Sequence, residues 1–355
     1  MASASVSQTY NPSTESSKRI RVKFLSRIVL PDLNIGQDYL RRFPGRVPTW
    51  HNCDFLFDPS EREYDWLVVY DDLPRNAPAE PLACPSGHTL LLTGEPSSIT
   101  YYGRAFLEQF GHVLTSQEPW ALRHPGVIRR QAGLLWYYGG SGEHGTHDAL
   151  STASPAPKTK LFSTVCSNKA MRHTLHSRRL AFTKQLKQDL PLLDVFGYGM
   201  GKLNDKAEAL DRYKYHLVIE NHSCVHHWTE KLADAYLGHC LPLYFGCTNL
   251  DEYFPRDSYI WIDIRDYDRA RAEIERVIHS DEYERRLPSI REARRLILEE
   301  YATFPQLAKL ISERHTSCLP DNVILRGRRA ARARRPFIGF LEIFAKMRQK
   351  LPLRS

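Results

Sequence analysis

Two hydrophobic periodicities alternate along the chain. Short apolar runs between polar residues are typical of buried strands, and apolar residues spaced three and four apart are typical of helices. Helical spacing occurs at 99–110, 177–188 and 229–238, and long charged helical patterns fill 267–315. Strands that alternate with helices predict an α/β fold with parallel sheets. The predicted strands lie within 19–25, 64–73, 88–96, 112–116, 160–168, 192–199, 213–221, 241–246 and 259–264.

Changes in composition divide the sequence into five segments. Its 355 residues suit two domains of ordinary size. The chain starts with a Ser- and Thr-rich segment, and small and polar residues with prolines fill Gly139 to Lys158 between the two domains. We expect a disordered leader (1–17), an N-terminal α/β domain (18–138), a linker (139–158), a C-terminal α/β domain (159–315) and a basic tail (316–355).

The net charge of +8 is concentrated in the tail. Residues 326–355 hold ten Arg and Lys and one acid, a net charge of +9, so the rest of the chain sums to −1. This nearly neutral body argues against nucleic-acid binding over the whole surface. The seven cysteines show no CxxC spacing, so we expect reduced thiols rather than disulfides or a zinc site. Without an apolar stretch of about 18 residues or a signal-like start, we expect a cytoplasmic protein.

The stretch 213–246 carries the clearest candidate chemistry. Asn221 ends a predicted strand, and Thr229, Glu230 and Lys231 open a predicted helix. A helix N-terminus offers unpaired N–H groups and a partial positive charge, and Lys231 adds a full cation, so a diphosphate would be stabilised there. The alternative is a capped surface helix whose Glu230 and Lys231 are solvated.

Three segments together carry a family resemblance. The first has a strand ending in Glu-Asn, seven intervening residues and then Thr-Glu-Lys at 229–231. The second is STVCSN at 163–168 followed by Arg179, and the third is the turn TGEP at 93–96. These motifs resemble the α1,3-fucosyltransferase family of the bacterial type, most specifically from Lys160 to Asp263.

The resemblance implies a GT-B architecture, in which two Rossmann-like domains face a central cleft. It also implies that GDP-fucose binds mainly in the C-terminal domain and that the acceptor binds in the N-terminal domain. The implied site residues are Glu95 as general base and, around the donor, Ser167, Asn168, Arg179, Asn221, His227, Thr229, Glu230 and Lys231.

Each implied role suits an inverting transfer. A base must deprotonate the acceptor hydroxyl as it attacks the anomeric carbon, and Glu95 at a strand end would serve. Negative charge grows on the departing diphosphate, which Arg179 and Lys231 would oppose. By resemblance, Glu230 accepts a hydrogen bond from the ribose. The alternatives are a solvated turn residue for Glu95 and a surface cation for Arg179, with Arg178 as a competitor for its role.

The sequence departs from the family pattern at His227, where the family usually carries Tyr. Either His227 substitutes as a donor to the sugar or phosphate, or the sugar differs from fucose. His226 and His227 lack a third ligand at helical spacing, so we expect no metal there. The DxD pattern of Asp266 and Asp268 opens a charged helix and predicts helix-start acids. We therefore expect no obligatory cofactor, with Mn²⁺ or Mg²⁺ at most as a stimulator.

The tail at 326–351 combines a basic run with apolar residues at helical spacing. This pattern is typical of a helix on an anionic membrane surface, with a helix packed on the protein itself and an RNA-binding tail as alternatives. We expect a peripheral protein at the inner face of the membrane. A fitting acceptor is an oligosaccharide or glycolipid, such as a lipid-linked glycan of bacterial lipopolysaccharide synthesis.

The predicted function is inverting transfer of fucose from GDP-fucose to a glycan that contains N-acetylglucosamine or glucose. One alternative keeps the fold and changes the nucleotide-sugar donor. The other is a membrane- or nucleic-acid-binding protein that acts through its basic tail, for which the α/β body is a scaffold.

Overall fold

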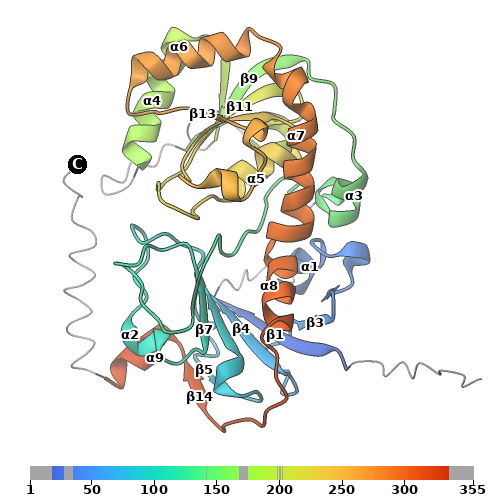
Figure 1. Cartoon of the computed structure of the whole chain (residues 1–355), viewed down its shortest axis with the longest axis vertical. Coiled ribbons are helices and arrows are strands. Elements are labelled where there is room, and N and C mark those ends of the chain that lie inside the picture. Colours follow the sequence, from blue (N-terminus) through green and yellow to red (C-terminus); the bar gives the residue numbers. More distant parts are fainter. Residues whose placement is uncertain are drawn as a thin grey trace, which may run out of the picture.

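Two mainly parallel β-sheets, one in each half of the chain, organise the structure (Figure 1). The computed structural model describes residues 18–27, 35–140, 142–167, 175–197, 199, 201 and 203–335. The predicted leader and most of the predicted membrane-binding helix lie outside these residues. Within the described ranges, every helix is too short or too polar to span a bilayer.

The N-terminal half forms a seven-stranded sheet of order β2-β3-β1-β4-β6-β7-β8. All neighbouring strands are parallel except β2 and β3. In β4 the side chains of WLVV are all buried, because a parallel sheet is covered on both faces. The strands are β1 (Ile20–Ser26), β2 (Thr49–Trp50), β3 (Cys53–Leu56), β4 (Trp66–Tyr70), β6 (Thr89–Leu92), β7 (His112–Thr115) and β8 (Val127–Arg129).

The C-terminal half forms a five-stranded parallel sheet of order β10-β9-β11-β12-β13. Each strand lies within a predicted range, and the helices α4, α5, α6 and α7 surround the sheet in Figure 1. The strands are β9 (Lys160–Val165), β10 (Leu193–Phe196), β11 (Tyr213–Ile219), β12 (Leu241–Phe245) and β13 (Ile260–Trp261), and the helices are α4 (His176–Asp189), α5 (Glu230–Leu237), α6 (Tyr267–Ile278) and α7 (Glu282–Leu296).

A helical run carries the chain from the C-terminal sheet back to the N-terminal one. α7 continues through a π-helical turn, Ile297–Tyr301, into α8 (Thr303–Ser312), and Figure 1 shows both beside the two sheets. The apolar residues of α8, among them Phe304 and Leu307, are buried in the core of the N-terminal sheet. The sequence-based division placed 303–315 in the C-terminal domain. In the structure α8 instead packs on the N-terminal sheet.

The residues after α8 also pack on the N-terminal half. β14 (Ile324–Arg326) pairs antiparallel with β5 (Ala79–Pro81), and α9 (Arg328–Ala333) follows. The start of the predicted tail is therefore attached to the body through backbone hydrogen bonds. The sequence predicted neither strand, because each has only three residues and the pair joins distant parts of the chain.

Two other segments differ from the sequence-based expectation. The predicted helix 99–110 shrinks to α2 (Arg104–Leu107), because the backbone at its N-cap, Gly103, is extended. Just before it, the Tyr102 hydroxyl donates to Asp71. The predicted linker contains a short helix, α3 (His147–Thr152), whose Asp148 accepts hydrogen bonds from the Gly45 backbone. The remaining described α-helix is α1 (Ile35–Leu40).

Candidate active site

A cavity of about 520 Å³, here called the central cavity, lies between the two halves. Its walls are the loops that follow the carboxyl ends of strands in both sheets, which is where ligands bind in open α/β folds. The predicted residues that line it are Glu95 from the N-terminal half and Asn221, His227, Thr229, Glu230 and Lys231 from the C-terminal half.

The turn that carries Glu95 is fixed by the residues before it. The buried hydroxyl of Thr93 donates to Thr115 Oγ1 at 2.7 Å. A Cβ on Gly94 would lie 2.5 Å from Tyr70 Oη, so only glycine fits between this tyrosine and the turn. The Glu95 carbonyl accepts a hydrogen bond from Gln117 Nε2 at 2.9 Å. These contacts place Glu95, which is exposed, at the N-terminal wall of the central cavity.

The start of α5 joins a cation to two carboxylates. Lys231 Nζ lies 3.1 Å from Glu230 Oε1 and 3.4 Å from Glu220 Oε2. The Thr229 hydroxyl accepts the N–H of Lys231 at 3.4 Å, which confirms Thr229 as the helix cap. The Thr229 backbone N–H donates to Glu220 Oε1 at 2.8 Å. Glu220 is fully buried, so it anchors both the cap and the lysine from below the cavity wall.

Burial and neighbouring charges act on this cluster in opposite directions. Burial would raise the pKa of Glu230, but Lys231 and Lys206 outweigh it and lower that pKa to about 2. Burial would lower the pKa of Lys231, but Glu230 and Glu220 raise it above its usual value. Burial raises the pKa of Glu220 against the opposite effect of Lys231. At neutral pH the cluster therefore keeps Lys231 protonated and Glu230 ionised.

Arg179 reaches the same strand ends from α4. Its Nη1 donates to Asn221 Oδ1 at 2.6 Å, and its Nη2 donates to Ser167 Oγ at 3.3 Å. Arg179 is buried whereas Arg178 is exposed, so of the two competitors Arg179 is the one placed beside Asn221. The predicted Asn168 lies outside the described residues.

His227 is enclosed between the two halves of the molecule. Its Nδ1 lies 3.2 Å from Ser116 Oγ. Burial, together with His222 and Lys231, lowers the pKa of His227 to about 3, so its imidazole is neutral at pH 7. A neutral imidazole has one N–H donor and one acceptor. The position where the family usually carries Tyr therefore retains a hydrogen-bonding group.

Sequence reasoning missed several side chains around the central cavity. Tyr70 and Tyr137 both line it. Lys206 Nζ pairs with Asp234 at 2.6 Å and lies 5.0 Å from the ring centroid of Tyr137. Tyr70 ends the apolar run WLVV, so the strand-end rule applied to Glu95 would have found it. Lys206 begins a short 3-10 helix and carries no local signal.

One group in the described part has the spacing of metal ligands. The ligand atoms of Glu118, His222 and Cys224 lie within 4.8 Å of one another. Glu118 Oε1 and His222 Nε2 are 2.8 Å apart, so this pair joins the two halves of the molecule. The carboxylate of Asp266 caps α6 by accepting the N–H of Arg269 at 3.2 Å, as predicted for a helix-start acid. That no metal is required stays a prediction.

Comparison with known proteins finds a family match in the half that contains α4, β11 and α5. Residues 155–286 match the family described as "Glycosyltransferase family 10 (fucosyltransferase) C-term". These residues resemble the C-terminal domain of that family. The domain includes every predicted donor-binding residue, from Ser167 to Lys231, whereas Glu95 lies before it. The predicted resemblance to fucosyltransferases and the prediction of a glycosyltransferase are confirmed at the level of this domain.

Two relatives show how far the family 10 likeness extends. The alpha-(1,3)-fucosyltransferase FucT of Helicobacter pylori is 32% identical over 78 residues, which are 22% of this chain and span only 16% of that relative. A crystal structure of an α1,3-fucosyltransferase matches with a TM-score of 0.52 at 15% identity. It covers 89% of this chain and 95% of the solved one, so the likeness establishes the fold. The predicted α/β fold of GT-B type is confirmed.

Proposed function

We propose that this protein transfers fucose from GDP-fucose to a glycan hydroxyl with inversion at the anomeric carbon. The observation that carries the proposal is the central cavity, with Glu95 on its N-terminal wall and Asn221, Glu230 and Lys231 on its C-terminal wall. A carboxylate for the acceptor and a cation for the diphosphate thus face one volume. The family 10 match supports fucose as the sugar.

On the acceptor side, Glu95 would act as the general base. Its carboxylate takes the proton of the acceptor hydroxyl while the hydroxyl oxygen forms a bond to the anomeric carbon. The bond from that carbon to the phosphate oxygen breaks, and its electron pair leaves with GDP. Attack opposite the leaving group inverts the anomeric carbon, through a transition state with oxocarbenium character.

On the donor side, the start of α5 would hold the diphosphate. Lys231 stays protonated because Glu230 and Glu220 raise its pKa, so it opposes the charge that grows on GDP. The partial positive charge at the N-terminus of α5 acts in the same direction. Arg179 holds Asn221 through a 2.6 Å hydrogen bond, so it contacts the diphosphate or positions Asn221 against it. Glu230, which is kept ionised, accepts from a ribose hydroxyl.

The surroundings of the reaction follow from charge and composition. A net charge of +9 over residues 326–355 supports attachment to the inner, anionic face of a membrane. A lipid-linked oligosaccharide that contains N-acetylglucosamine or glucose would meet the enzyme there. Because Lys231 and the helix N-terminus already supply positive charge to the diphosphate, the proposed reaction has no obligatory metal.

Calorimetric titration of the full chain with GDP, without added metal, tests the donor site. We expect binding in the micromolar range that Lys231→Ala weakens by about tenfold or more, because a charge-assisted contact is lost. Lys184→Ala is the matched control, since it removes an exposed lysine of the same domain on α4. Selective binding of UDP would show that the donor is a UDP-sugar and not GDP-fucose. If neither nucleotide bound, the alternative in which the basic tail is the active part would remain.

A further inference from the structure

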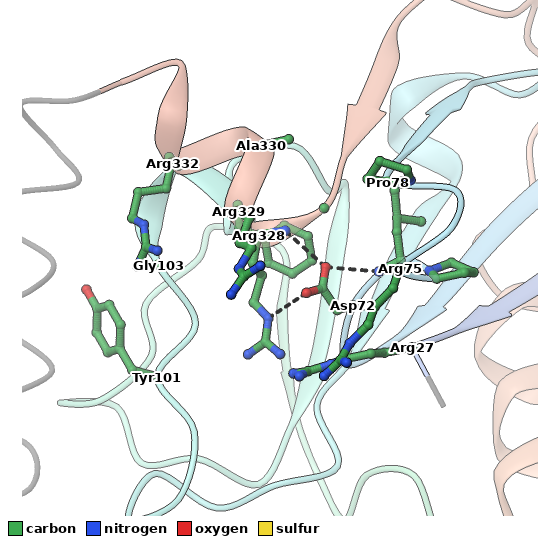
Figure 2. A pocket seen from close by; sticks show the side chains of 15 residues that line it. Arg27, Asp72, Arg75, Pro78, Tyr101, Gly103, Arg328, Arg329, Ala330 and Arg332 are labelled. Atoms are coloured by element: carbon green, nitrogen blue, oxygen red, sulfur yellow. Dashed lines mark hydrogen bonds and ion pairs between the residues drawn. The ribbon is translucent and has the colours of Figure 1, made fainter. Parts of the chain in front are cut away.

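A second cavity, of about 470 Å³, lies on the N-terminal half where the returning chain end packs on it. Figure 2 shows the side chains around it, which come from the segments after β1 and β4, the segment before α2, and α9. We call it the arginine cavity, because its charged lining consists of Asp72 and five arginines, namely Arg27, Arg75, Arg328, Arg329 and Arg332.

One of the five arginines is tied to the protein. Arg328 Nε donates to Asp72 Oδ2 at 3.0 Å, and the Arg328 backbone N–H donates to Asp72 Oδ1 at 3.0 Å. The guanidinium of Arg328 also lies 5.3 Å from the ring centroid of Tyr102. These contacts fix the start of α9 against the loop after β4, so one wall of the arginine cavity is rigid.

The described residues supply no such partner for the other four arginines. Within the described ranges, no carboxylate lies in ion-pair distance of Arg27, Arg75, Arg329 or Arg332. Arg27, Arg75 and Arg328 come from three segments, and all three line this one cavity (Figure 2). Like charges that converge around a hollow repel each other, and an anion inside the hollow would reverse that effect.

The type of cation indicates the type of anion. Arginine presents a planar fork of N–H donors that matches phosphate oxygens two at a time, and clusters of arginine recognise phosphate groups. A volume of about 470 Å³ lies in the range of small-molecule sites and exceeds the needs of one simple ion. Tyr101 adds a hydroxyl to the lining. A phosphate ester or diphosphate with part of its organic group fits this description.

We propose that the arginine cavity binds a phosphate-bearing group, a phosphate ester or diphosphate, at a site separate from the donor. Arg328 covers Tyr102, the Tyr102 hydroxyl donates to Asp71, and Asp71 accepts the N–H of Gly94 at 3.0 Å. Contacts therefore run from the arginine cavity to the turn that carries Glu95. That the group belongs to the acceptor, as in a phosphate-linked glycan, rests on the proposed function, whereas the binding itself does not.

Titration of the full chain with inorganic pyrophosphate, in the presence of excess GDP, tests the binding. We expect saturable binding that Arg75→Gln and Arg329→Gln each weaken by about tenfold or more. Arg334→Gln is the matched control, because it removes the same charge just after α9 without lining the cavity. If all three variants weakened binding equally, general charge attraction would explain the binding and the proposal would be overturned. The absence of pyrophosphate binding would overturn it as well.

Two further measurements distinguish a lipid phosphate from a soluble one, and binding in the arginine cavity from binding in the central cavity. If a lipid headgroup occupies the arginine cavity, the Arg75→Gln variant should no longer bind vesicles of phosphatidylcholine with phosphatidic acid. Unchanged vesicle binding, with pyrophosphate binding lost, assigns the site to a soluble or glycan-linked phosphate. If Lys231→Ala alone removed pyrophosphate binding, the pyrophosphate would bind in the central cavity and the proposal would be overturned. This outcome can be recognised even if GDP fails to bind.

Discussion

The two cationic sites of this protein balance their charge in different ways. In the central cavity, Lys231 lies within 3.4 Å of both Glu220 and Glu230, and the cluster is neutral or negative before any ligand arrives. In the arginine cavity, five arginines face the single carboxylate of Asp72. The first arrangement fixes a lysine in place for a reaction, because its partners hold it and keep it protonated. The second leaves positive charge that no carboxylate of the described residues balances, and an added anion would balance it.

This difference predicts that the chemistry belongs to the central cavity. Glu95→Gln keeps the shape of the side chain and removes the base, so we expect kcat to fall by about 10²–10⁴-fold. Binding of GDP should be unchanged, because Glu95 lies on the wall opposite Lys231. Glu63→Gln, which changes an exposed carboxylate of the same half, is the control. A loss of GDP affinity that matches the loss of kcat would contradict the role of a base.

Removing one carboxylate from each site tests the balance of charge directly. Glu220 is fully buried and holds both Lys231 and the backbone of Thr229, so Glu220→Ala leaves a buried cation with less compensation. We expect the free energy of unfolding to fall by about 3–5 kcal/mol. Urea unfolding measures this loss, and GDP affinity should fall with it because the start of α5 loses its anchor.

Asp72→Ala is the counterpart in the arginine cavity. The Asp72 side chain is 16% exposed and Arg328 is 21% exposed, so water replaces part of the lost contact. We expect a loss of about 1–2 kcal/mol in the free energy of unfolding, with GDP affinity unchanged. Equal losses in Asp72→Ala and Glu220→Ala would show that burial and charge balance do not distinguish the two sites.

The segment between the two cavities offers a test of comparable size. A Cβ at Gly94 would lie 2.5 Å from Tyr70 Oη, so Gly94→Ala should lower the free energy of unfolding by about 1–3 kcal/mol and move Glu95. Tyr70→Phe removes the clashing oxygen, so the double variant should recover part of the stability. Gly87→Ala is the control, because a Cβ there would meet no atom within 4 Å. Additive effects of Gly94→Ala and Tyr70→Phe would contradict the close approach.

The same contrast explains what could be predicted from the sequence. The parallel strands, the cap at Thr229 and the cluster beside it depend on residues that are near one another in the chain or at strand ends, so periodicity and motifs locate them. The arginine cavity joins Arg27 to Arg328, which no local pattern connects. The packing of α8 and the pairing of β14 with β5 likewise depend on surfaces that form only when both halves have folded.

The last prediction concerns pH, and its effect is small near neutrality. Burial, His222 and Lys231 lower the pKa of His227 to about 3, whereas in the unfolded chain the histidine titrates near its ordinary 6.5. Between these values the unfolded state binds more protons, so stability falls as the pH decreases, by about 1.4 kcal/mol for each pH unit. His227→Gln should reduce the slope by this amount, which urea unfolding at several pH values between 6.5 and 4 would measure. His216 and His239, whose pKa burial likewise lowers to about 3, keep their own contributions.

An exposed histidine provides the control for this slope. His279→Gln, at the end of α6, should leave the pH dependence as in the unchanged protein. The residues that line the arginine cavity include no histidine, so its arginines stay charged over the same range. Mild acid should therefore weaken the region around Lys231 while pyrophosphate binding by the arginine cavity persists. If His227→Gln and the unchanged protein lost stability in parallel, the enclosed neutral imidazole would not be the source of the acid sensitivity.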